Sequence, residues 1–220
     1  MRLEKDFTTA VELGASQIST YPFIHFSYAP SRKKPMSQWQ KRKLLDSLRD
    51  VSRKMGYERT SIWTFARKGT PRYSSVTREA FIGHGRSAAT LSSGSFSINI
   101  FSVDEYIKAI ADGKSATTLT LHFTKRVRML CWLFWSCYNL DIRNEAFRQM
   151  FGCDLDSVFS RELSLASSFG LLEMNNRGYR LTDRGAYYFH LVEQHYTHQY
   201  IDKTWRTCSH NPWPRHIKLY

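Results

Sequence analysis

The sequence predicts two parts: an α/β first part over residues 1–115, and a mainly helical, winged-helix-like part over residues 120–205. Segments with helical and with strand-like patterns alternate in the first part, which is typical of α/β construction. In the second part, three helical segments precede a short hairpin and a closing helix. The remaining residues, 206–220, form a C-terminal tail.

The elements of the first part follow from apolar spacing and from residues that start or stop helices. Ser37 is a helix N-cap, and Gly56 ends the helix that it begins. Pro22 has no backbone N–H, so the strand around it cannot lie at a central position of a sheet. The expected elements are helices at 3–13 and 37–54, and strands at 17–23, 60–65 and 95–100, with a further strand leading to Gly83.

The second part follows a helix that Ser102 caps, over Val103–Ala111, and a linker at residues 113–118. Thr182 caps the closing helix after an Asn-Asn-Arg-Gly hairpin turn. The expected elements are helices at 124–139, 143–151 and 156–169, strands at 170–174 and 178–182, and a helix that runs to about residue 195.

Composition and the ends of the chain limit the class of protein. Hydrophobic residues make up 42% and aromatic residues 15% of the 220 residues, which indicates a folded chain. The longest apolar run, Met129–Tyr138, is too short to cross a membrane. The N-terminus has no apolar core like that of a signal peptide, so we expect a cytoplasmic protein without a membrane partner. The four cysteines lack the spacing of a metal site, and buried free thiols are expected.

The positive charge is concentrated in the first half of the chain. Residues 1–100 contain 17 Lys and Arg against 7 Asp and Glu, whereas residues 101–220 contain 15 against 12. Such a field favours an anionic partner: nucleic acid, an acidic membrane surface or a ligand with several carboxylates. A solvated helix face is the alternative for the basic residues between Lys41 and Lys54.

The segment Phe81–Thr90 contains two glycines one residue apart, Gly83 and Gly85, followed by small side chains. Glycine is required where the backbone adopts a positive φ or comes close to another group. A strand that ends in such a turn can present backbone N–H groups to a phosphate, a carboxylate or a cofactor edge. A tight turn with no ligand is the alternative.

Winged helices often bind DNA, but the expected recognition helix at 156–169 offers only Arg161, beside Asp156 and Glu162. The hairpin adds Arg177 and Arg180. Binding to DNA depends on several phosphate contacts, so this module favours a structural role over nucleic-acid binding.

An ordered series of motifs resembles the C-terminal half of the oxygen-independent coproporphyrinogen III oxidase-like family of radical S-adenosylmethionine (SAM) enzymes. The series covers nearly the whole chain. Its members are Ile18–Phe23, Gly56-Tyr57-Glu58, Trp63–Arg67, Tyr73–Arg78, Gly83–Ala88, Asn99 with Tyr106, Phe147–Gly152, Gly170-Leu171-Leu172 and Leu181–Gly185. The tail, with Tyr200–Trp205 and Asn211–Pro214, resembles the haem-utilisation subgroup, whose members are similar to anaerobic haem-degrading methyltransferases.

The resemblance implies a partial, half radical-SAM-type barrel over residues 1–115 and binding of SAM and a tetrapyrrole. The family holds a [4Fe–4S] cluster on a CxxxCxxC loop, and this sequence contains no such loop. Two explanations are open: the chain is a fragment or a truncated reading frame, or it is an open half-barrel that needs the missing N-terminal half as a partner. In either case we expect that the chain cannot bind the cluster and is inactive alone.

The resemblance also implies roles for individual residues. The implied SAM-binding residues are Tyr21, Ile24, Gly83, Gly85 and Ala89. Arg86 would pair with a propionate of haem or coproporphyrinogen, and His84 would be a polar or iron-facing contact, with a plain surface histidine as the alternative. Arg67, Arg72, Tyr73 and Arg78 lie in loops beside expected strand ends, where ligands bind, and complete the expected tetrapyrrole-binding set.

Three functions stay open at this point. The first is half of a tetrapyrrole-processing radical SAM enzyme. The second is a non-catalytic haem-binding or haem-trafficking protein. The third is a basic winged-helix protein that binds nucleic acid.

Overall fold

A computed structural model describes residues 2–29, 31–71, 73–74 and 79–217. The chain divides into two compact units, and each is built from three separate segments. Unit 1 comprises Met1–Ile24, Lys33–Thr77 and Trp135–Leu191; unit 2 comprises His25–Arg32, Arg78–Phe134 and Val192–Tyr220. These units are interleaved along the chain, whereas the domains expected from the sequence, 1–115 and 120–205, are consecutive.

Unit 1 begins with helices α1 (Arg2–Glu12) and α2 (Gln38–Lys54). The α2 N-terminus has a complete capping box: the Ser37 side chain accepts from the Gln40 backbone N–H, and the Gln40 side chain accepts from the Ser37 N–H. Leu44, Leu45 and Leu48 lie on one face of α2 and are buried. The sequence prediction for this helix is confirmed, with its start shifted by one residue.

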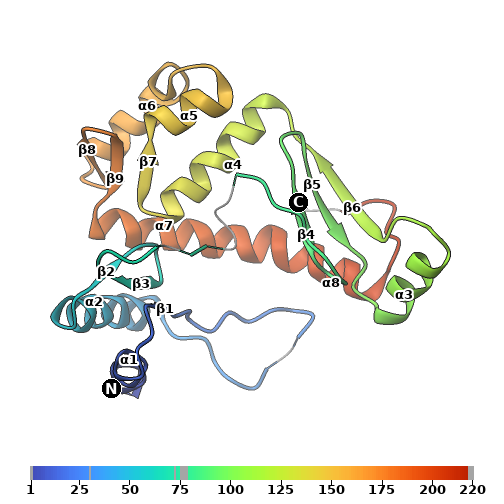
Figure 1. Cartoon of the computed structure of the whole chain (residues 1–220), viewed down its shortest axis with the longest axis horizontal. Helices are drawn as coiled ribbons and strands as arrows, with labels where there is room; N and C mark the ends of the chain where they lie inside the picture. The colour runs from blue at the N-terminus through green and yellow to red at the C-terminus, as the bar shows by residue number, and fades with distance from the viewer. Residues whose placement is uncertain (1, 30, 72, 75–78, 218–220) are drawn as a thin grey trace. The chain divides into compact units, whose positions relative to one another are not determined.

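A three-stranded antiparallel sheet, ordered β1-β3-β2, packs beside α2 in unit 1 (Figure 1). Its strands are β1 (Gln17–Ser19), β2 (Tyr57–Arg59) and β3 (Thr64–Arg67). The single strand expected over 60–65 is wrong: the chain turns between β2 and β3, where the Thr60 and Ser61 N–H groups both donate to the Thr64 carbonyl oxygen. The antiparallel order also means that the C-terminal ends of β1 and β3 point in opposite directions.

The rest of unit 1 follows the order strand, helix, helix, hairpin, helix. The elements are β7 (Asp141–Arg143), α5 (Asn144–Phe151), α6 (Leu155–Ser168), β8 (Leu172–Asn175), β9 (Gly178–Leu181) and α7 (Asp183–Tyr196). The three strands form an antiparallel sheet ordered β7-β9-β8 (Figure 1). Phe147, Leu155 and Phe159 are buried between the helices and this sheet. The Thr182 hydroxyl accepts from the Gly185 N–H, so the predicted cap of α7 is confirmed.

Unit 2 contains a third antiparallel sheet, ordered β4-β5-β6. Its elements are β4 (Ala89–Leu91), β5 (Ser95–Asn99), α3 (Val103–Ala111), β6 (Thr117–His122) and α8 (Asp202–His210), with the first part of α4 (Lys125–Tyr138) and a π-helical turn at Thr197–Ile201. Ile100, Ala109 and Ala116 form a small core against Tyr106. The linker expected at 113–118 ends in β6, and the strand expected before Gly83 is reduced to an isolated bridge between Phe81 and Leu91.

Every strand pair in the described part of the chain is antiparallel. The sequence analysis placed ligand-binding residues in loops beside the strand ends, and these sheets do not bring the C-terminal strand ends together at one edge. In a parallel sheet those ends meet at one edge, but in an antiparallel sheet they alternate between two edges.

Candidate functional site

The glycine-containing turn of unit 2 is a fixed structure held against the end of β5. Gly85 has φ +94° and Ser87 has φ 53°, so two residues of the turn are left-handed. Asn99 Nδ2 donates to the Gly85 carbonyl oxygen at 2.9 Å, and the Ser87 N–H donates to the Ile100 carbonyl oxygen at 2.9 Å. The requirement for glycine at position 85, predicted from the sequence, follows directly from its φ.

Gly83 is required for a different reason. A Cβ at this position would lie 2.2 Å from the backbone oxygen of Ala89, and real Cβ atoms do not approach backbone that closely. The Gly83 N–H donates to the Thr90 hydroxyl at 3.1 Å, which closes the loop. The group that comes close to Gly83 is therefore the chain's own backbone at Ala89, and SAM binding by Gly83, Gly85 and Ala89 stays a prediction.

Arg86 and His84 are both exposed residues of this turn. One guanidinium nitrogen of Arg86 donates to the Phe101 carbonyl oxygen at 2.9 Å, which orients the side chain and leaves its other N–H groups available. His84 lies at the surface, as in the alternative considered for it. The structure brings Arg86 next to Phe101, a residue that the sequence analysis did not select.

Phe101 belongs to a half-buried group of four aromatic residues in unit 2, which we call the aromatic cluster: Phe26, Tyr28, Phe101 and Trp205. The rings of Phe26 and Trp205 are stacked, with centroids 5.7 Å apart and an interplanar angle of 24°. Tyr28 meets Trp205 edge-on at 6.1 Å, and Phe101 lies 6.3 Å from Trp205. The cluster thus joins the segment 25–32, the end of β5 and helix α8.

Asp202, the first residue of α8, fixes the segment that carries Phe26 and Tyr28. Its carboxylate accepts from the Ser27 N–H at 2.7 Å. Burial, and secondarily the charge of Asp202, raise the pKa of Tyr28, so this phenol is neutral at physiological pH. Together with Arg86, the cluster presents aromatic faces beside a cation.

The predicted site residues of unit 1 do not form one group. Tyr21, which is 65% exposed, and the partly buried Ile24 follow β1, whereas Arg67 ends β3 and so lies at the opposite end of this sheet. Tyr73 lies at the Arg67 end, because its backbone exchanges two hydrogen bonds with the Gln17 side chain, at 2.9 and 3.0 Å. Arg67 contacts the Tyr57 ring at 5.9 Å from its centroid. The remaining predicted residues, Arg72 and Arg78, lie outside the described residues.

The sequence analysis missed the aromatic cluster. Its one signal was Trp205 in the tail, which was assigned to the subgroup resemblance. Phe26, Tyr28 and Phe101 follow no periodic pattern, and they are separated from Trp205 by more than 100 residues. Only the folded chain shows that they meet.

All four cysteines lie in the described part of the chain, and no three of them are gathered in one place. Burial raises the pKa of Cys137 to about 12 and also raises that of Cys208. Within the described ranges no three His, Cys, Asp or Glu side chains are grouped closely enough to hold a metal ion. None of the described helices is long and apolar enough to span a membrane.

The fold is similar to that of coproporphyrinogen III oxidase (HemN) from Escherichia coli, which is a radical SAM enzyme. The two structures superpose with a TM-score of 0.63 and 16% sequence identity, over 86% of this chain and 50% of the HemN chain. This chain therefore spans about half the length of the solved structure and has the mixed α/β fold of that half. No protein-family model and no curated protein matches the sequence.

Proposed function

We propose that this chain is the C-terminal half of a protein related to oxygen-independent coproporphyrinogen III oxidases, and that its unit 2 binds a tetrapyrrole. The observation that carries the proposal is the position of Arg86 beside the aromatic cluster, reached through its hydrogen bond to Phe101. The fold likeness to HemN and the ordered series of family-like motifs support the same assignment.

The chemistry of this surface suits a tetrapyrrole. Half-buried aromatic rings offer apolar faces to a large planar macrocycle. An exposed guanidinium forms strong, often bidentate hydrogen bonds with a carboxylate, and haem and coproporphyrinogen both carry several carboxylates.

The finer parts of this assignment belong to the same proposal. Tyr21, Ile24, Gly83, Gly85 and Ala89 contribute to SAM binding in the complete protein, and the cluster-binding cysteines lie in the half of the fold that this chain does not span. We assign a structural role to the module β7, α5, α6, β8, β9 as a variant of the winged helix, and its order of strand, two helices and hairpin supports this assignment. Membership of the haem-utilisation subgroup rests on the tail alone.

A titration tests the proposal. Haemin or coproporphyrin III is added to the purified chain while the absorbance of the porphyrin and the fluorescence of tryptophan are followed. We expect Trp205→Ala to weaken binding about two- to tenfold, because one aromatic contact is lost. Arg86→Ala should weaken binding about tenfold, because a charge-assisted hydrogen bond is lost.

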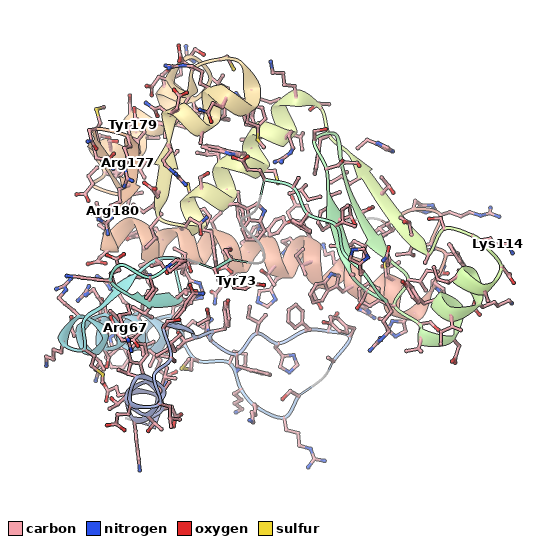
Figure 2. The ribbon with its side chains drawn as sticks, viewed as in Figure 1. Arg67, Tyr73, Lys114, Arg177, Tyr179 and Arg180 are labelled. Carbon is pink, nitrogen blue, oxygen red and sulfur yellow. The ribbon has the colours of Figure 1, made fainter. Side chains whose placement is uncertain are left out.

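Trp39→Ala and Lys114→Ala are the matched controls, since both residues are exposed and neither belongs to the aromatic cluster (Figure 2 labels Lys114). Equal losses in the controls and in the two site variants would overturn the proposed location. No saturable porphyrin binding by the wild-type chain would overturn the function.

A second measurement separates the enzyme half from a non-catalytic haem-binding protein. Anaerobic reconstitution of this chain with iron and sulfide should give no iron–sulfur absorbance band, because no cluster-binding cysteines are grouped in its described part. If the enzyme assignment is right, mixing the chain with a separately expressed N-terminal half of a related enzyme should restore SAM cleavage. If that mixture binds haem without cleaving SAM, the non-catalytic function is favoured.

A further inference from the structure

Two adjoining hollows in unit 1 form a polar groove that the tetrapyrrole assignment does not use. Their volumes are about 470 and 500 Å³, and they share Arg49, Arg59 and Asp183. The groove is formed by α2, β2, the β8–β9 hairpin and the first turns of α7. These elements come from two distant stretches of the sequence, residues 42–68 and 173–188.

The walls of this groove are strongly basic. Seven basic residues line it, against four acidic ones. Asp46 and Asp183 already form ion pairs, because each carboxylate lies 3.2 Å from the Arg49 guanidinium. Among the described residues, five of the basic groups have no ion-pair partner: Arg42, Arg53, Lys68, Arg180 and Arg184.

Arg59 forms a fixed cationic floor shared by the two hollows. Its side chain is 8% exposed, and its Nε and one Nη donate to the Ile62 carbonyl oxygen at 3.0 and 2.7 Å. Burial lowers the pKa of Arg59 to about 10, with the carboxylate of Asp183 opposing this effect, so the guanidinium stays charged at neutral pH.

Aromatic rings lie beside these cations. The Arg42 guanidinium lies 5.3 Å from the centre of the Tyr187 ring, and that of Arg184 lies 5.8 Å from the centre of the Tyr188 ring. Tyr188 is 45% exposed. Cations that follow a groove, interleaved with exposed aromatic faces, are the combination that binds single-stranded nucleic acid, because phosphates pair with the cations and bases stack on the rings.

We propose that this groove binds single-stranded nucleic acid without sequence preference. The argument against DNA binding from the sequence considered only the helix at 156–169 and the hairpin. Those elements supply one of the seven cations of the groove, Arg180, together with Glu173 and Leu181. Figure 2 shows Arg177 and Arg180 on that hairpin. The other cations come from α2, β2, the turn after β3 and α7. An acidic polypeptide would also form ion pairs with the basic residues of the groove, but it carries no bases to stack on the exposed Tyr188 ring.

Fluorescence anisotropy with a labelled oligothymidylate tests this proposal on the full chain. Arg42→Ala and Arg184→Ala should each weaken binding about threefold, and the double variant about tenfold. The slope of log K against log salt should fall in magnitude by about 0.7 for each arginine removed, because each single-strand phosphate contact releases that fraction of a counterion. Tyr188→Ala should weaken binding about fivefold, whereas Tyr188→Phe, which keeps the ring, should bind like the wild type.

The double variant Arg161→Ala/Lys114→Ala removes the same charge from exposed positions outside the groove and should bind like the wild type. An equal loss in this control would overturn the location. Equal competition by polyglutamate or by the corresponding duplex would overturn the assignment to a single strand. The site variants, at Arg42, Arg184 and Tyr188, differ from those of the porphyrin titration, at Arg86 and Trp205, so each proposal can fail while the other stands.

Discussion

The Trp63 indole N–H donates to Nδ1 of His190 at 3.1 Å, and both side chains are almost completely buried in unit 1. The indole can only donate, so Nδ1 of His190 accepts, and the neutral ring carries its proton on Nε2. The two rings also meet edge-on, with centroids 5.0 Å apart. This contact fixes the turn between β2 and β3 against α7.

Trp63→Phe removes the donor and keeps most of the apolar ring. We expect the free energy of unfolding to fall by about 1–3 kcal/mol, because the buried Nδ1 acceptor loses its hydrogen bond. Urea denaturation, followed by a spectroscopic signal from unit 1, measures this change in unfolding free energy. Trp39→Phe, at a position that is 67% exposed, is the matched control and should change stability little. If the two variants lose equal stability, the buried hydrogen bond does not matter.

Tyr179 and Asp156 form a second link, between the buried Tyr179 on β9 and the exposed Asp156 on α6. The Tyr179 hydroxyl donates to the Asp156 carboxylate at 2.7 Å (Tyr179 is labelled in Figure 2). Burial first, and then the hydrogen bond and charge of Asp156, raise the pKa of Tyr179 to about 12. An unfolded tyrosine ionises near pH 10. Between these two values the unfolded chain has lost a proton that the folded chain keeps, so stability falls as pH rises.

Tyr179→Phe should lower the free energy of unfolding at pH 7 by about 1–2 kcal/mol, because a hydrogen bond to a charged group is lost. Above pH 10 the difference between wild type and variant should shrink, since only the wild type loses this contribution as the phenol ionises. Urea denaturation at pH 7 and at about pH 11 measures both differences. A difference that is constant with pH would show that the phenol does not titrate as described.

The local features of the fold could be predicted from the sequence because they depend on neighbouring residues. The helix at 38–54, its Ser37 cap and the Thr182 cap are set by side chains within three positions of the helix start. The need for glycine at position 85 likewise follows from one backbone angle.

The arrangement of strands could not be predicted, because it depends on long-range pairing. β1 pairs with β3 in an antiparallel register, with Gln17 opposite Ala66, and the short segments carry no pattern that distinguishes this from a parallel order. The same limit applies to the candidate site. Trp205 meets Phe26 and Phe101 only after the chain has folded, and the predicted residues Tyr21 and Arg67 lie at opposite ends of one sheet.

Removal of the Ser37 N-cap tests how much the capping of α2 contributes to the stability of the chain. Ser37→Ala leaves the Gln40 N–H without its acceptor and should lower the free energy of unfolding by about 1 kcal/mol. Ser160→Ala changes an exposed serine within helix α6, where alanine is the better helix former, and should leave stability unchanged or slightly higher. Thermal unfolding followed by circular dichroism compares the two. A loss in Ser160→Ala as large as that in Ser37→Ala would argue against a specific capping effect.

Gly83→Ala tests whether the glycine turn needs close packing of the chain on itself. The new methyl group would lie 2.2 Å from the Ala89 oxygen, so the turn has to move, and we expect a loss of about 2–4 kcal/mol in unfolding free energy. Gly94→Ala, in the β4–β5 hairpin of the same unit, meets nothing within 4 Å and should be nearly neutral. Gly83 stands three residues before Arg86 in this turn, so a shift of the backbone at Gly83 should also displace Arg86. Gly83→Ala should therefore weaken porphyrin binding as well, whereas Gly94→Ala should not. If Gly83→Ala unfolds like the wild type but still weakens porphyrin binding, the glycine is needed for ligand approach and not for packing against Ala89.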